Sequence, residues 1–261
     1  MDKDDVYIPV PSTGLTSPTS WGSRDQIKKM IEKIWTNYGK FFQFASLNSK
    51  IPAQMLVSFC AVESGGNPTA GSSGHITQGL MQWNRTYAKS QLESELKQNR
   101  LSPDEKSKLA SFGIKFDSNG KTREITNADQ LKPELNILIG SIVLGQLVDT
   151  DWGKEVDIKK ATEYAKQLFI DNASKGIVIT EMEAIEQAKK KFMTLRLDRV
   201  ISVYNAGAYG DTGKKARTGN YTTPKDLASA VNDTTANYIK KIMGKNGALD
   251  IAVTDLPHLF A

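Results

Sequence analysis

Glu63 is the residue whose position most suggests chemistry, because it ends an otherwise apolar segment at residues 53–62. That segment has the pattern of a helix buried on all sides, with Pro52 in its first turn and Gly65 and Gly66 just beyond its end. Burial and the negative end of the helix dipole both disfavour a carboxylate there, so both raise its pKa. The pattern predicts a general acid that holds its proton near neutral pH. A Glu that faces solvent or pairs with a cation is the alternative, which local spacing leaves open.

Amphipathic helices are expected to hold this acid in place. A Ser23–Gln26 capping-box pattern precedes an apolar stripe of helical period made by Ile27, Met30, Ile31, Ile34, Trp35 and Tyr38. Further helices are predicted at residues 91–111, 134–149, 157–173, 181–204 and 234–243. Residues 69–77 are predicted to form a loop or short hairpin, and Asn119-Gly120 indicates a hairpin within 112–127. The expected fold is mainly α, with one or two small β-hairpins.

The two ends of the chain differ from its middle. Residues 1–22 are rich in Pro, Ser and Thr and lack a helical or strand period, so we expect a flexible N-terminal arm. One domain is expected over residues 23–247. The tail at 248–261 has no assignable task, and its apolar residues are expected to pack on the domain or on a partner.

Composition excludes several function classes. Apolar residues make up 39% and charged residues 24% of the 261, as in ordinary globular proteins, and the longest mainly apolar stretch, 55–62, is far below the roughly 20 residues of a membrane span. No export signal is visible, so synthesis in the cytoplasm is expected. Cys60 is the single cysteine, so no intramolecular disulfide can form, and its position in an apolar run predicts a core residue. The net charge of +5 comes from scattered lysines, which predict no nucleic-acid surface. His75 and His258 are far apart and no nucleotide-binding loop is present, so neither metal nor cofactor is expected.

Four pieces of sequence within residues 52–243 resemble, in order, the motifs of the soluble lytic transglycosylases. They are ESGGNP at 63–68 with SSG at 72–74 and GLMQ at 79–82; Pro133 with Asn136, Ile137 and Gly140; VYNAG at 203–207; and NYIKK at 237–241. The resemblance implies a lysozyme-like fold and a cleft for the glycan strands of peptidoglycan. It implies that Glu63 first protonates the glycosidic oxygen and then deprotonates the muramoyl C6 hydroxyl, which closes a 1,6-anhydro ring. It also implies that Ser72, Gln82, Tyr204 and Asn205 contact the substrate. The alternative is a structural role for each, with Ser72 in a loop, Gln82 on the surface, Tyr204 in the core and Asn205 as a helix-end cap.

The sequence departs from this family in four places. The family often has a second Met two residues beyond the Gln of GLMQ, whereas Asn84 stands there in this sequence, so a glycan subsite is expected to differ. The family's late Glu-Thr-x-x-Tyr pattern is Thr234-Thr235-Ala236-Asn237-Tyr238 here, so its auxiliary carboxylate is missing. Two intervals, near residues 88–130 and 150–198, are longer than in a minimal domain of this type. These insertions, with Trp152 in the second, are expected either to lengthen the glycan groove or to contact a partner.

Alternatives to a transglycosylase remain open at this point. A hydrolytic muramidase is the nearest, because goose-type lysozymes share the fold. No Asp or Glu follows Glu63 within ten residues, although a second carboxylate could come from elsewhere in the fold. A non-catalytic wall-binding virion protein is the other alternative. With no export signal, we expect action at the periplasmic peptidoglycan after delivery in a bacteriophage virion, with tail or other virion proteins as partners, or release during late lysis.

Overall fold

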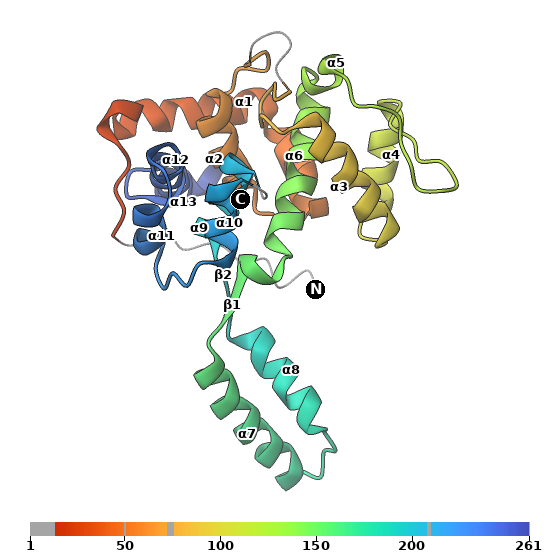
Figure 1. Ribbon diagram of the computed structural model, residues 1–261, viewed down its shortest axis with the longest axis vertical. Helices are drawn as coiled ribbons and strands as arrows, with labels where there is room; N and C mark the ends of the chain where they lie inside the picture. The colour runs from red at the N-terminus through yellow and green to blue at the C-terminus, as the bar shows by residue number, and fades with distance from the viewer. Residues whose placement is uncertain (1–13, 50, 72–75, 208–209, 261) are drawn as a thin grey trace.

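A computed structural model describes residues 14–49, 51–71, 76–207 and 210–260. These residues form a mainly helical protein, which confirms the predicted class (Figure 1). The helices of the first half are α1 (Arg24–Ser49), α2 (Ala53–Ser64), α3 (Arg85–Lys97), α4 (Pro103–Ser111), α5 (Asn127–Gln130) and α6 (Pro133–Val148). Those of the second half are α7 (Ile158–Ser174), α8 (Glu181–Lys191), α9 (Leu197–Ala206), α10 (Asp211–Thr218), α11 (Pro224–Ala230), α12 (Asp233–Met243) and α13 (Ala248–Thr254).

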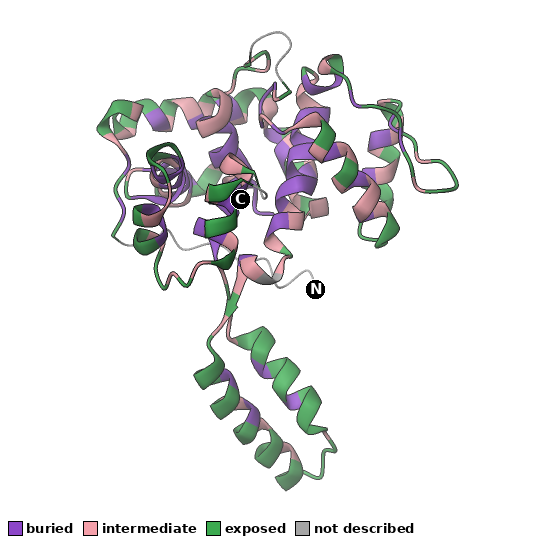
Figure 2. Ribbon diagram, in the orientation of Figure 1, coloured by how far each residue is buried: buried purple, intermediate pink, exposed green. Residues whose placement is uncertain are grey.

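The core is built around α2 and α6, which are apolar on nearly every side and buried along most of their length. Amphipathic α1 packs on both of them through Ile27, Ile31, Ile34 and Phe42. In Figure 1, α3 to α5 lie on one side of this pair, whereas α9 to α13 gather on the other side. Figure 2 shows the buried residues concentrated where these two groups meet. No helix among the described residues combines the length and the apolar character needed to cross a membrane.

Two predicted helices are interrupted. The helix expected at 91–111 is split into α3 and α4, because Ser102 and Glu105 form a capping box and Pro103 occupies a first helical turn. The helix expected at 181–204 is split into α8 and α9 by strand β2 (Met193–Leu195), which pairs antiparallel with β1 (Lys154–Val156). The hairpin expected around Asn119-Gly120 is reduced to one antiparallel bridge between Phe116 and Thr122.

Strands β1 and β2 form a narrow stalk that carries α7 and α8 away from the body of the protein (Figure 1). We call these two helices and the turn between them, residues 158–191, the α7–α8 hairpin. The two helices pack on each other through a small core of Ala161, Ala165, Ala184 and Ala188. Most of the second predicted insertion, residues 150–198, thus forms a projecting pair of helices, and its being an insertion stays a prediction.

Both described ends of the chain pack on the body. Residues 1–13 of the expected arm lie outside the described residues, but Leu15 is buried and residue 16 forms a parallel bridge with Lys245. The tail folds into α13, which packs on α1, α2 and α12. Arg24 of α1 binds Asp250 and Asp255. The tail therefore packs on the domain, which is one of its two expected positions. Residues 14–22 differ from the expected flexible arm, because Leu15 is buried in the core.

Candidate active site

Glu63 lies in the last turn of α2, where two glycines turn the chain sharply. Gly65 caps the helix at φ 60°, in the left-handed region that favours glycine, and its N–H donates to the carbonyl of Ala61. Gly66 also has positive φ, and a Cβ there would lie 2.5 Å from Cγ1 of Ile34 in α1. The Gly-Gly pair thus ends α2 and brings the chain close past α1, which leaves Glu63 at the edge of the core.

The side chain of Glu63 is half-buried, and its carboxyl group is hydrogen-bonded to an aromatic hydroxyl. Burial raises its pKa to about 7, against the opposing effect of the hydrogen bond that Tyr238 of α12 donates to Oε1. The direction of this shift is the one predicted from the sequence. The hydrogen-bond partner of Glu63 is neutral, since burial and the nearby charge of Glu63 raise the pKa of Tyr238 as well. Glu63 therefore has the properties of a general acid at neutral pH.

Aromatic rings form the wall beside Glu63. Phe59, one turn earlier on α2, makes edge-on contacts with Tyr204 of α9 at 5.0 Å between ring centroids and with Tyr238 at 6.4 Å. Cys60 on the same turn is fully buried, as predicted for a core residue, and burial raises the pKa of its thiol to about 12. The aromatic wall holds three helices together at the acid and supplies the low-polarity surroundings that keep it protonated.

The loop at residues 77–84 is held against α6 by one buried amide. Oδ1 of Asn136 accepts a hydrogen bond from the N–H of Met81 at 2.7 Å, and Nδ2 donates to the carbonyls of Gln78 and Gln130. The backbone carbonyl of Asn136 accepts from Nε1 of Trp83 at 2.9 Å. Because this loop has no regular ladder of its own, Asn136 fixes its position on the helix.

Three of the four residues expected to contact substrate lie near Glu63, and Ser72 lies outside the described residues. Gln82 has the positive φ of 49°, unusual for a residue with a side chain, and its Nε2 donates to the carbonyl of Gly79. The hydroxyl of Tyr204 donates to the carbonyl of Met81 at 2.6 Å. Oδ1 of Asn205 accepts from the Thr235 hydroxyl at 3.0 Å. The structure brings Gln82, Tyr204 and Asn205 together, while their contacts with a substrate stay a prediction.

These side chains line a hollow of about 520 Å³, which we call the Glu63 pocket. Its other walls are Thr77, Trp83, Asn84, Tyr87, Val143, Leu147, Val203, Ala206, Gly207 and Gly210. Glu63 supplies the one carboxylate among these described lining residues. A pocket of this size, apolar with a few converging polar groups, suits a small organic ligand or a segment of a polymer.

A second hollow, the Trp152 pocket, adjoins the first and shares Tyr87 and Leu147 with it. Its remaining walls are Gln91, Arg100, Gln146, Asp149, Thr150, Trp152 and Arg217. Trp152 and Thr150 belong to the second insertion, at the base of the stalk. The Oε1 atom of Gln146 is buried there without a hydrogen-bond partner. Because they share two wall residues, the two pockets lie side by side.

Two important residues of the site were not among the predicted ones. Tyr238 belongs to the NYIKK motif, but its contact with Glu63 spans 175 positions of sequence, beyond the reach of local patterns. Asn136 was likewise recognised by resemblance alone. A buried amide in an apolar helix is a detectable signal, because such a group needs several hydrogen-bond partners.

Comparison with known families adds one match. Residues 40–115 match the profile of the transglycosylase SLT domain. The matched segment runs from α1 to just beyond α4 and includes Glu63, the Gly-Gly turn and the loop that carries Gln82. The mainly helical architecture is consistent with the lysozyme-like fold of this family, and the match supports a lytic transglycosylase-type protein that acts on peptidoglycan. Curated proteins yield no match to the chain.

Proposed function

We propose that this protein cleaves the β-1,4 bond between N-acetylmuramic acid and N-acetylglucosamine in peptidoglycan and leaves a 1,6-anhydromuramoyl end. The observation that carries the proposal is the acid at the end of α2. Glu63 has a pKa raised to about 7, lines the Glu63 pocket, and lies within the segment that matches the transglycosylase SLT domain. A protonated carboxylic acid at neutral pH is what a glycosidic leaving oxygen requires.

In the proposed reaction Glu63 works first as acid and then as base. Its carboxyl proton passes to the glycosidic oxygen as the bond between that oxygen and the muramoyl C1 breaks. The resulting carboxylate then takes the proton of the C6 hydroxyl, whose oxygen forms a new bond to C1. Glu63 ends protonated, no water is consumed, and the products are an anhydro end and a free hydroxyl on the departing sugar.

Tyr238 is suited to support the carboxylate that exists between these two proton transfers. Its hydroxyl donates to Oε1, so Oε2 is the oxygen proposed to exchange the proton with the sugar. Hydrogen bonds to an ionised group are stronger than those to a neutral one, so this contact strengthens as the first proton leaves. Gln82, Tyr204 and Asn205, together with Ser72, are proposed to position the sugars around Glu63.

Hydrolysis by a muramidase is the competing reaction of the same bond. In an inverting hydrolase a second carboxylate activates water, and a retaining one uses a second carboxylate as nucleophile. Among the described residues that line the Glu63 pocket none supplies that second group, which favours the internal C6 hydroxyl as the attacking group.

Mass spectrometry of fragments released from purified peptidoglycan tests the proposal. We expect muramoyl ends lighter by one water than hydrolytic ends, and loss of at least about 1,000-fold in rate for Glu63→Gln. Glu163→Gln, an exposed carboxylate on the α7–α8 hairpin, is the matched control and should leave the rate unchanged. Hydrolytic ends would assign a muramidase, and undiminished clearing of walls by Glu63→Gln would leave a non-catalytic wall-binding role.

Delivery in a bacteriophage virion, with action at the periplasmic peptidoglycan, is proposed as the biological setting. The projecting α7–α8 hairpin supports it as a surface available for assembly (Figure 1). Electron microscopy of phage particles labelled with an antibody against this protein tests the setting. Label on intact particles is expected, and label found only in lysates of infected cells would assign the late-lysis role.

A further inference from the structure

The α7–α8 hairpin carries most of the large apolar side chains that the described residues expose. Ten such side chains are exposed, and seven of them belong to this hairpin: Ile158, Phe169, Ile170, Ile177, Val178, Met182 and Ile185. Figure 2 shows both helices exposed along most of their surface, in contrast to the body. Apolar residues gathered on one projecting element mark an interaction surface, because scattered exposure would need no explanation.

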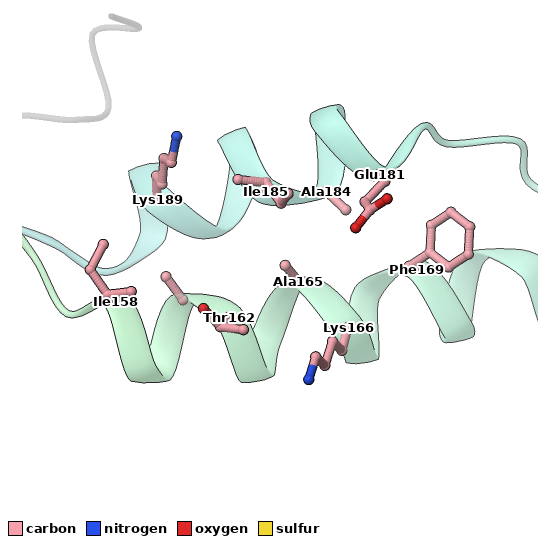
Figure 3. Close-up of a pocket in the computed structure, with 10 residues that line it drawn as sticks. Ile158, Thr162, Ala165, Lys166, Phe169, Glu181, Ala184, Ile185 and Lys189 are labelled. Carbon is pink, nitrogen blue, oxygen red and sulfur yellow. The ribbon is translucent and has the colours of Figure 1, made fainter.

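A groove of about 430 Å³ runs between the two helices (Figure 3). Small residues, Ala161 and Ala165 of α7 and Ala184 of α8, line it together with larger ones, among them Ile158, Phe169 and Ile185. Ile158 lies at the end near the stalk and Phe169 lies near the tip. Small side chains beside larger ones leave space that side chains from another helix can fill.

The hairpin has little core of its own. Its fully buried members are four alanines, which bury little apolar area compared with the Leu, Ile and Phe residues of the body. Two short helices with so small a core are marginal in water without further packing. A partner that covers the groove would supply the missing burial.

Charge at the groove's two ends indicates what this partner is. Lys189 lines the end near the stalk, whereas Glu181 lines the end near the tip. We propose that the occupant is the α7–α8 hairpin of a second copy of this chain, bound antiparallel. A twofold axis through the alanines then places Glu181 of each copy at Lys189 of the other, and Phe169 of each copy near Ile158 of the other. The result is a four-helix bundle made of two hairpins.

The geometry of the molecule permits this arrangement. The hairpin extends from the body on its stalk, so two antiparallel hairpins overlap while the two bodies stay at opposite ends (Figure 1). A 17-residue helix is about 25 Å long and each helix is about 10 Å wide, so the contact covers about 500 Å² on each copy. This area is at the small end of specific interfaces and predicts a dissociation constant on the order of 10–100 µM. The proposal does not depend on the catalytic one.

Analytical ultracentrifugation of the full chain with a charge-swapped pair of variants tests the proposal. The wild type should dimerise with rising concentration. Glu181→Lys and Lys189→Glu should each dimerise about tenfold more weakly, because each places like charges at both contacts. An equimolar mixture of the two should regain wild-type dimerisation, since each variant then meets its complement. Recovery on mixing excludes unfolding of the hairpin as the cause of the single-variant losses.

Glu163→Lys is the matched control, since residue 163 lies on α7 outside the groove, and it should dimerise like the wild type. A wild type that stays monomeric to about 500 µM, well above the expected dissociation constant, would overturn the proposal in favour of a different occupant. A mixture that stays as weakly associated as the single variants would overturn the antiparallel arrangement.

Discussion

Replacing Tyr238 by Phe removes the one hydrogen bond that the described residues give to the carboxyl group of Glu63. The substitution removes a single oxygen atom and keeps the ring that packs edge-on against Phe59, with centroids 6.4 Å apart. Burial raises the pKa of Glu63 to about 7, and the Tyr238 hydroxyl opposes that rise. Without the hydroxyl the carboxylate loses its donor, so the pKa of Glu63 rises further.

The size of this effect follows from the difference between two hydrogen bonds. A hydrogen bond to a charged group contributes about 1.5–3 kcal/mol, and one to the neutral acid contributes about 1 kcal/mol. The difference of roughly 1.4 kcal/mol corresponds to about one pH unit. Because the protonated form of Glu63 starts the reaction, kcat/KM is retained below its pKa and lost as pH rises through it. The alkaline limb should therefore move upward by about one pH unit in Tyr238→Phe.

The assay is kcat/KM on soluble glycan strands between about pH 5 and pH 9, which brackets the raised pKa of Glu63. The plateau at low pH should also fall by about tenfold, since the hydroxyl stabilises the carboxylate formed in the first proton transfer. Tyr164→Phe, on the α7–α8 hairpin, is the control and should reproduce the wild-type profile. An alkaline limb that stays in place or moves downward would refute the assignment of Glu63 as the titrating acid.

Two further predictions concern the loop at residues 77–84 and the Trp152 pocket. Gly79→Ala should lower the free energy of unfolding by more than about 3 kcal/mol in urea titration, because its Cβ would lie 2.2 Å from the carbonyl oxygen of Gln130. Gly207→Ala, with similar positive φ but open space around it, should lose only about 1 kcal/mol, and equal losses would contradict the clash. Trp152→Ala should lower kcat/KM about tenfold on long strands and leave that on short fragments unchanged, if the Trp152 pocket binds distant sugars. A uniform loss on both lengths would indicate a purely structural role.

The parts of the fold that sequence predicted are those that depend on nearby residues. The stripe of α1 and the apolar run of α2 follow from side chains three to four positions apart, which one helix face brings together. The raised pKa of Glu63 follows from the same source, since its burial is implied by the mainly apolar run at residues 53–62 that precedes it. The capping box at Thr180 and Glu183, which begins α8, is likewise a signal between residues three positions apart.

The parts that sequence did not predict depend on contacts between distant segments. Strand β2 interrupts a helical pattern because residues 193–195 find a partner about forty positions earlier in β1. Tyr238 reaches Glu63 only after α12 has packed on α2, and no periodicity indicates that contact. The break before α4 was detectable, since Ser102, Pro103 and Glu105 form a strong local start signal.

The stalk allows the α7–α8 hairpin to be separated from the body at one narrow point. Val156 and Met193 face each other across β1 and β2, and paired residues on antiparallel strands lie about 5 Å apart. A two-residue turn spans that gap. Residues 157–192 can thus be deleted or replaced as one unit without a change in the order of the helices in the body. The proposed cleavage of peptidoglycan and the proposed dimerisation would then reside in separable parts of one polypeptide.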